Sequence, residues 1–277
     1  MDLDFENPYT ERTPRVVAAA KLHRGNARRK AKAFIVEGEN SVEAAIATGA
    51  AKDLFVTAEA AERFAEIVKT ARYLDVFIHP ITAKAADTLA DTVSSPGIFA
   101  VCSPVLWSMR NSLKRPRLVS VPVETRDPGN AGTLIRISDA VGADAVIFAG
   151  DTVDPQASKV VRSSAGSLFH LPVARERDIH RVLGSLQNQG LQILATAADG
   201  ELSLDDAEEV LAKPTAWLFG NEAHGLSEEL AARADHRIAI PIRGSAESLN
   251  LATAAAICLY ESARVQARSE REFRSSI

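Results

Sequence analysis

The sequence predicts an α/β protein with two domains, and three observations lead to this prediction. The chain has 277 residues, 46% hydrophobic and 25% charged, enough to bury the cores of two domains. Short β-rich runs alternate with helical runs, which is typical of a mostly parallel sheet with helices on both faces. A stretch rich in proline and polar residues, SPVLWSMRNSLKRPR, divides the chain. We therefore predict an N-terminal domain at 1–106, a linker at 107–116 and a C-terminal domain at 117–277.

The N-terminal part predicts a small α/β sandwich. Its β-branched and aromatic runs predict strands at 34–36, 54–56, 76–78 and 98–101. Between them, apolar residues at helical spacing predict helices at 39–48 and 58–72.

The alternation resumes after the linker. Strands are predicted at 117–121, 145–149, 192–196, 216–219 and 236–242, and helices at 132–141, 178–188, 227–232 and 249–268. In a parallel sheet of this kind, ligands bind at the carboxyl ends of the strands.

Composition excludes several classes of protein. The two cysteines, Cys102 and Cys258, have no C-x-x-C partner, so a disulfide framework or zinc site is disfavoured and structural thiols in a reducing cytoplasm are expected. The six histidines show no metal-ligand spacing, so we expect no metal. No apolar run follows the opening MDLDFENPYT and no stretch is long enough to span a bilayer, so no membrane association is expected.

The net charge of −4 conceals a basic cluster near the N-terminus. Residues 12–32 contain eight Lys or Arg residues and no acid. Such a cluster neutralises phosphates, and the alternative is a solvated basic tail. The residues predicted to bind RNA are Arg28, Arg29, Lys30 and Lys32.

The phosphate-binding fingerprints G-x-G-x-x-G and G-x-x-x-x-G-K-[ST] are both absent, which disfavours a dinucleotide or P-loop nucleotide. Three other polar clusters follow predicted strands, at 130–136, 218–227 and 240–256. Taken singly each has a local explanation: Asn130 as a helix cap, Gly220 as a turn residue and Ser248 as the cap of the last helix.

Taken together, the three clusters resemble the motifs of the SpoU (TrmH-like) RNA 2′-O-ribose methyltransferases of the SPOUT superfamily. The first is N-x-G-x-x-x-R from Asn130 to Arg136, the second GNEAHGL from Gly220 to Leu226, and the third IP followed by ESLNL from Ile240 to Leu251. The segment RRKAKAFIVEGENSVEAA at 28–45 resembles the L30e-like substrate-binding domain often attached to this family.

The resemblance implies a deep trefoil knot in the C-terminal domain, with S-adenosylmethionine bound in the knot. It also implies a homodimer and an RNA substrate, first of all 23S rRNA. The cofactor contacts it implies are Thr196, Leu218, Gly220, Ile240 and Leu249, with glycine at 220 allowing close approach to the ligand. The catalytic residues it implies are Asn130, Arg136, Glu222, Ser248 and Asn250.

Arg136 lies six residues after Asn130, ~9 Å along a helix, and a long side chain there can reach the site. A guanidinium is always protonated, so it is suited to gripping an RNA phosphate and orienting the 2′-hydroxyl rather than to removing a proton. The alternative is a surface ion pair with Asp139 or Asp144. His224, within the second motif, is not assigned a role in acid–base catalysis.

Three other functions stay open at this point. One is a tRNA 2′-O-methyltransferase, and another is a non-catalytic RNA-binding or ribosome-binding protein that keeps the same fold. The third is a nucleotide-binding enzyme with a doubly wound sheet, which the basic segment and the missing phosphate fingerprints disfavour.

Overall fold

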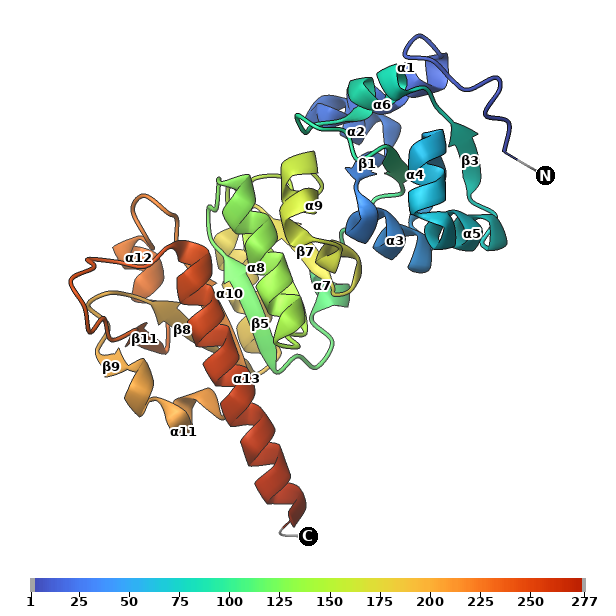
Figure 1. The fold of residues 1–277 in the computed structure, drawn as a ribbon. Helices are drawn as coiled ribbons and strands as arrows, with labels where there is room; N and C mark the ends of the chain where they lie inside the picture. Colours follow the sequence, from blue (N-terminus) through green and yellow to red (C-terminus); the bar gives the residue numbers. More distant parts are fainter. Residues whose placement is uncertain (1–2, 276–277) are drawn as a thin grey trace. The chain divides into compact units, whose positions relative to one another are not determined.

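The computed structural model describes residues 3–275, and side chains for residues 3–271. The chain forms two compact units, which we describe separately (Figure 1). The first contains the chain up to Val105 together with Asp154–His170, and the second contains Leu106–Val153 and the chain from Leu171 onward. Residues 154–170 thus pack with the first unit, although the sequence places them inside the predicted domain 117–277.

The first unit is built on a four-stranded sheet with the order β1-β4-β2-β3. Its strands, all predicted from the sequence to within a few residues, are β1 (Phe34–Glu37), β2 (Ala51–Val56), β3 (Phe77–Pro80) and β4 (Ile98–Cys102). β4 pairs antiparallel with β1 and β2, while β2 and β3 are parallel.

Short helices cover this sheet. Those before residue 100 are α1 (Pro14–Ala20), η1 (Lys21–His23), α2 (Gly25–Ala31), α3 (Glu39–Ala47), α4 (Ala58–Arg63), α5 (Ala65–Tyr73) and α6 (Ala83–Leu89). The helix predicted at 58–72 is split, because Phe64 leaves helical geometry with φ −112° and ψ 41°. The basic segment 12–32 is folded as α1, η1 and α2 and is not an extended tail.

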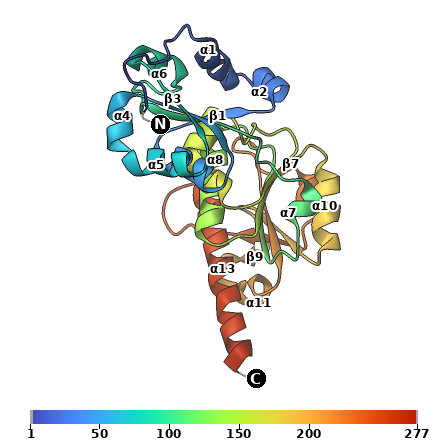
Figure 2. The same cartoon turned by 90° about the vertical axis from the view of Figure 1, so that its right-hand side faces the viewer.

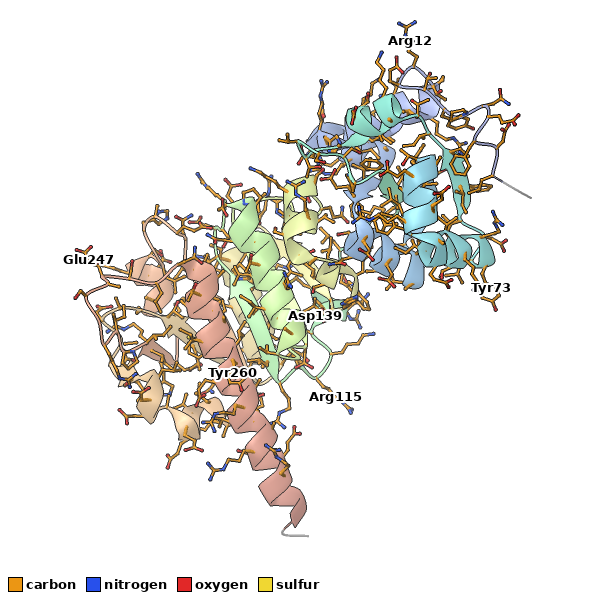
Figure 3. The ribbon with its side chains drawn as sticks, viewed as in Figure 1. Arg12, Tyr73, Arg115, Asp139, Glu247 and Tyr260 are labelled. Carbon is orange, nitrogen blue, oxygen red and sulfur yellow. The ribbon has the colours of Figure 1, made fainter. Side chains whose placement is uncertain are left out.

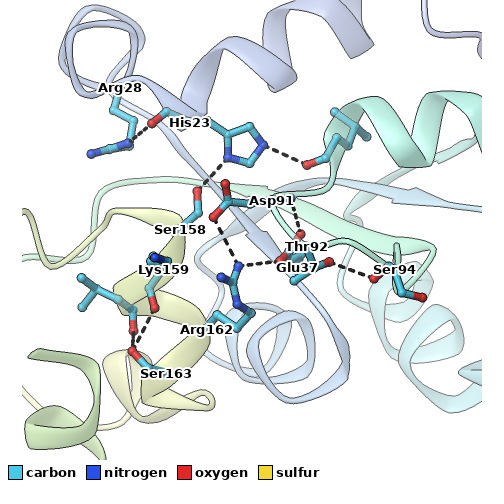
Figure 4. A network of polar contacts seen from close by, with 12 residues as sticks. His23, Arg28, Glu37, Asp91, Thr92, Ser94, Ser158, Lys159, Arg162 and Ser163 are labelled. Carbon is cyan, nitrogen blue, oxygen red and sulfur yellow. Dashed lines mark hydrogen bonds and ion pairs between the residues drawn. The ribbon is translucent and has the colours of Figure 1, made fainter. Parts of the chain in front are cut away.

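The segment Asp154–His170 supplies α9 (Ser158–Ser164) and η2 (Ser167–Phe169) to the first unit. Phe169 stacks on Phe34 of β1 with ring centroids 6.0 Å apart. Polar contacts reinforce this packing (Figure 4): Arg162 donates to Glu37 over 2.8 Å, and His23 contacts Ser158 over 2.8 Å. The first unit is therefore completed by a segment that is distant in the sequence.

The second unit contains a seven-stranded sheet in the order β7-β6-β5-β10-β8-β11-β9, with every neighbouring pair parallel. The strands are β5 (Leu118–Pro122), β6 (Ala145–Ala149), β7 (Val173–Glu176), β8 (Gln192–Thr196), β9 (Leu202–Ser203), β10 (Thr215–Phe219) and β11 (His236–Ala239). This confirms the predicted α/β class with a mostly parallel sheet. β7 and β9, both at sheet edges, were not predicted.

Helices cover both faces of this sheet, as Figure 2 shows for α10 and α13. On one face lie α8 (Pro128–Ala140), η3 (Leu204–Asp206), α11 (Glu208–Leu211) and α13 (Leu251–Ser275). On the other lie α7 (Met109–Ser112), α10 (Ile179–Asn188) and α12 (Glu228–Ala231). Trp217 of β10 anchors α13, since its indole nitrogen donates to Ser262 over 2.8 Å.

The predicted linker is an ordered part of the second unit. Trp107 donates its backbone N–H to Val173 of β7 over 2.8 Å, and α7 follows directly. Leu113 is buried in the core beneath the sheet.

Candidate active site

The carboxyl ends of β8, β10 and β11 surround a pocket of about 200 Å³ in the second unit. Among the predicted site residues, the structure places six on this pocket: Thr196, Gly220, Glu222, Ile240, Ser248 and Leu249. The strand predicted at 236–242 ends at Ala239, so Ile240 and Ile242 belong to the loop that closes the pocket.

The walls combine apolar side chains with carboxylates. Apolar residues that sequence analysis did not assign to the site also line it: Ala197, Ala198, Ile238, Ile242, Leu251 and Ala254. Among the described residues, the charged ones that line the pocket are Glu222 and Glu247, the second of which projects outward on its loop in Figure 3. A pocket with apolar walls and carboxylates suits a ligand that carries both an aromatic group and positive charge.

Leu218 lies outside the pocket lining. Its side chain is fully buried in the core of the second unit, because it points into the sheet–helix interface from β10. Its carbonyl accepts a hydrogen bond from Thr196 Oγ1 over 3.3 Å, so Leu218 orients a lining residue.

Gly220 begins a tight loop. Asn221 and Gly225 exchange two backbone hydrogen bonds of 3.0 and 2.9 Å. A Cβ at Gly220 would lie 2.4 Å from the Gly225 carbonyl carbon and 2.5 Å from the Leu226 nitrogen. The space beside Gly220 is therefore filled by the returning loop, a different reason for glycine from the ligand contact inferred from the sequence.

A chain of hydrogen bonds joins three predicted catalytic residues. Asn130 Nδ2 donates to Glu222 Oε1 over 3.3 Å, and Asn250 Nδ2 donates to Asn130 Oδ1 over 3.2 Å. The fold thus brings Glu222 and Asn250, which lie 92 and 120 positions after Asn130 in the sequence, next to its side chain.

Helix termini position these amides. Asn250 Oδ1 accepts the backbone N–H groups of Ala252 and Thr253 at the start of α13, so Asn250 caps this helix. Asn130 does not cap α8, contrary to the sequence interpretation. Asp127 does, accepting the Asn130 N–H over 2.7 Å, and Pro128 occupies the first turn.

Arg136 lies on the exposed side of α8. Within the described residues it has no hydrogen-bond or ion-pair partner, so the surface pair with Asp139 or Asp144 is not formed. Asp144 instead accepts the backbone N–H groups of Arg117 and Leu118. The guanidinium is free to bind an anion.

The four basic residues predicted to bind RNA differ in exposure. Arg29, Lys30 and Lys32 are exposed, whereas Arg28 is only 7% exposed. Arg28 donates to Asp154 over 2.6 Å and to the carbonyls of Leu22 and His23. This corrects the expectation for Arg28, whose guanidinium is used to hold the first unit together.

The two cysteines are structural thiols, as the sequence predicts. Both cysteines are free and buried, and burial raises the pKa of the Cys102 and Cys258 thiols well above the ordinary range. Residues 3–275 contain no cluster of three or more potential metal ligands. Nor does any helix in this range have the length and apolar character needed to cross a bilayer.

Models of two protein families match separate parts of the chain. Residues 117–260 match the model of the SpoU rRNA Methylase family, and residues 35–106 match a model described as RNA 2′-O ribose methyltransferase substrate binding. A 23S rRNA (guanosine(2553)-2′-O)-methyltransferase, RlmP of Bacillus subtilis, is 32% identical over 87% of this chain and 92% of its own length.

Two solved structures are similar over nearly the whole chain. The SpoU methyltransferase AviRb from Streptomyces viridochromogenes, in complex with AdoMet, is 29% identical with a TM-score of 0.81, covering 92% of this chain and 100% of that one. An AdoMet-bound rRNA methyltransferase from Sinorhizobium meliloti is 28% identical with a TM-score of 0.79, covering 91% and 95%. The chain, in which the second and third motifs line one pocket and Asn130 of the first is hydrogen-bonded to Glu222, belongs to the SpoU rRNA methylase family.

Proposed function

We propose that this protein transfers a methyl group from S-adenosylmethionine to a ribose 2′-hydroxyl of 23S rRNA. The observation that carries the proposal is that the second and third motifs line one pocket at the carboxyl ends of β8, β10 and β11, while Asn130 of the first motif is hydrogen-bonded to Glu222 and Asn250. The relatives named as 23S rRNA 2′-O-methyltransferases and the AdoMet-bound structures support the same activity and cofactor.

The pocket fits S-adenosylmethionine by its chemistry. Ile238, Ile240 and Leu251 offer apolar contacts for an adenine ring, and the carboxylates of Glu222 and Glu247 favour the positive sulfonium and ammonium groups. The backbone at Gly220 and Leu249 offers hydrogen-bonding groups. The bound cofactor supplies an electrophilic methyl group, and the protein's main task is to hold the acceptor oxygen in line with it.

The predicted catalytic residues divide this task. Arg136, exposed on α8 and without a partner among the described residues, binds a phosphate next to the target ribose and orients its 2′-hydroxyl. Glu222, Asn130 and Asn250 form the hydrogen-bonded chain that fixes the rim of the pocket, and Ser248 lies on the adjoining loop.

The first unit is proposed to recognise the RNA. Its match to a substrate-binding model supports this, and an L30e-like fold within the proposed domain 1–106 is part of the proposal. Arg29, Lys30 and Lys32 are exposed for phosphate contacts. The linker at 107–116, the methyltransferase domain at 117–277 and a cytoplasmic location complete the assignment.

A trefoil knot and a homodimer belong to the same proposal. After β11 the chain returns by the loop 240–250 to α13, which packs beside α8 on the face of β5 and β10. Residues Ile240 and Leu249 of this loop line the pocket together with Thr196 at the end of β8 and Gly220 after β10, which supports the proposed knot. α13 exposes Tyr260, labelled in Figure 3, and Ile257, which are suited to pairing with a second copy.

Methyl transfer to defined RNA tests the proposal. The full chain is incubated with tritiated S-adenosylmethionine and either 23S rRNA or a tRNA pool, and the product is digested with alkali. A 2′-O-methyl group blocks alkaline cleavage, so label in an alkali-resistant dinucleotide from 23S rRNA is expected. Label only in tRNA would favour the tRNA alternative, and cofactor binding without transfer to either RNA would favour the non-catalytic alternative.

A further inference from the structure

Glu124 lies two residues after the end of β5 in an unusual backbone conformation. Its φ of 50° is in the left-handed region, which residues with a Cβ seldom adopt. Such a conformation persists only when the surroundings fix it, and it is frequent at functional sites.

Backbone contacts tie Glu124 to two neighbouring loops. Its N–H donates to the carbonyl of Ala149, at the end of β6, over 2.9 Å. Its carbonyl accepts a hydrogen bond from Asn221 Nδ2, in the loop after β10, over 2.7 Å. Glu124 therefore joins the carboxyl ends of three strands.

The side chain of Glu124 contacts both neighbouring loops. Glu124 Cγ occupies the space beside Gly150, where an added Cβ would lie 2.9 Å from it. The carboxylate lies 3.9 Å from His224 Nε2, in the same loop as Asn221. The absence of a side chain at Gly150 thus makes room for Glu124.

Asn221 connects Glu124 to the pocket. It is 8% exposed, lines the pocket, and exchanges backbone hydrogen bonds with Gly225. Its side-chain oxygen accepts the N–H of Ala223 over 2.9 Å. The side chain of Asn221 thus links the Glu124 carbonyl to the interior of the loop that carries Glu222.

We propose that Glu124 is a positioning residue for the cofactor pocket. Its wedged side chain holds the left-handed conformation, which presents the carbonyl to Asn221 and so fixes the loop 220–226. The proposal rests on the proposed function, because it identifies the pocket as the S-adenosylmethionine site. Glu124 does not itself line the pocket and acts through Asn221.

Calorimetry with S-adenosylmethionine on the full chain tests this role. Glu124→Gly keeps the left-handed conformation accessible but removes the side chain that packs beside Gly150. The carbonyl of residue 124, which accepts the hydrogen bond from Asn221, is then no longer held in place. We expect a five- to twentyfold higher Kd for S-adenosylmethionine. KM for the cofactor should rise by the same factor, while kcat at saturating cofactor changes less than twofold, because bound cofactor restores the loop.

Two further variants separate positioning from general stability. Glu124→Gln retains the wedge and should bind within twofold of wild type, since the contact with His224 is long and exposed. Asp75→Gly is the matched control, because Asp75 is an exposed acid with φ 56° in the first unit, and it should leave the Kd unchanged. If Glu124→Gly lowers Tm too far for binding studies, Glu124→Asn, which tolerates the left-handed region with a shorter side chain, gives the same comparison.

A double-mutant cycle with Gly150→Ala gives an independent test. The added Cβ collides with Glu124 Cγ, so Gly150→Ala should weaken binding more in wild type than in the Glu124→Gly background. The strain from the φ of +84° at Gly150 and the contact of the added Cβ with Ile179 Cδ1 at 3.0 Å are common to both backgrounds and cancel. Additive effects, or wild-type affinity in Glu124→Gly, would overturn the role of Glu124. A wild-type chain that binds no S-adenosylmethionine would instead overturn the proposed function.

Discussion

Replacing Gly220 with alanine should weaken S-adenosylmethionine binding by a calculable amount. The new Cβ would lie 2.4 Å from the Gly225 carbonyl carbon, whereas ordinary contacts begin at 3.4 Å, so the two backbone segments must separate by about 1 Å. That movement breaks the two hydrogen bonds of 3.0 and 2.9 Å between Asn221 and Gly225. At about 1 kcal/mol each, the loss is about 2 kcal/mol. This corresponds to a roughly 30-fold higher Kd.

Titration calorimetry of the full chain measures this Kd, with Gly142→Asn as the matched control. Gly142 lies outside the pocket lining, has φ +75° and has no atom within 4 Å of an added Cβ, and asparagine tolerates this conformation. The control should therefore change the Kd less than threefold. Wild-type affinity in Gly220→Ala, or equal losses in both variants, would refute the steric explanation.

Four other outcomes are expected. Arg136→Ala should abolish methyl transfer in the tritium assay while the Kd for S-adenosylmethionine stays unchanged; normal turnover would show that the free guanidinium has no part in the reaction. Replacing Arg29, Lys30 and Lys32 with alanine should lower the slope of log K for RNA against log salt by about 0.7 to 0.9 per lost phosphate contact, and an unaltered slope would contradict RNA binding by this segment. Arg28→Ala should lower the free energy of unfolding by about 3 kcal/mol in urea denaturation, because Asp154 loses its buried partner; a loss below ~0.5 kcal/mol would contradict this role. Ellman's reagent at pH 8 should leave Cys102 and Cys258 unmodified until the protein is denatured, since burial raises both pKa values and the neutral thiol is unreactive; rapid labelling of the native protein would argue against burial.

The parts of the fold with strong local signals were predictable from sequence. The strands β5, β6, β8 and β10 are mostly apolar runs, and their order with the helices indicates a parallel sheet. β7 was missed because its sequence VARE carries two charged residues at a sheet edge. The start of α8 was placed too late, although the Asp-Pro pair at 127 and 128 is a helix-start signal.

The site was predictable as a set of motifs but not as a geometry. Sequence placed Asn130, Glu222 and Asn250 in one site, while the hydrogen bonds that join them depend on where three loops meet. The burial of Arg28 had no local signal at all. The carboxylate that neutralises it lies 126 residues away, and nothing near Arg28 in sequence distinguishes it from Arg29.

The segment Asp154–His170 has a consequence for how the protein emerges from the ribosome. When residues up to Val105 have been synthesised, the partner of Arg28 and the ring that stacks on Phe34 have not yet been made. Synthesis at roughly 5–20 residues per second leaves the first unit incomplete for several seconds, while β5, α8 and β6 are added. The first unit therefore cannot complete its packing until residues 154–170 have been synthesised. The folding of the first unit thus depends on a segment that lies within the second of the two family matches.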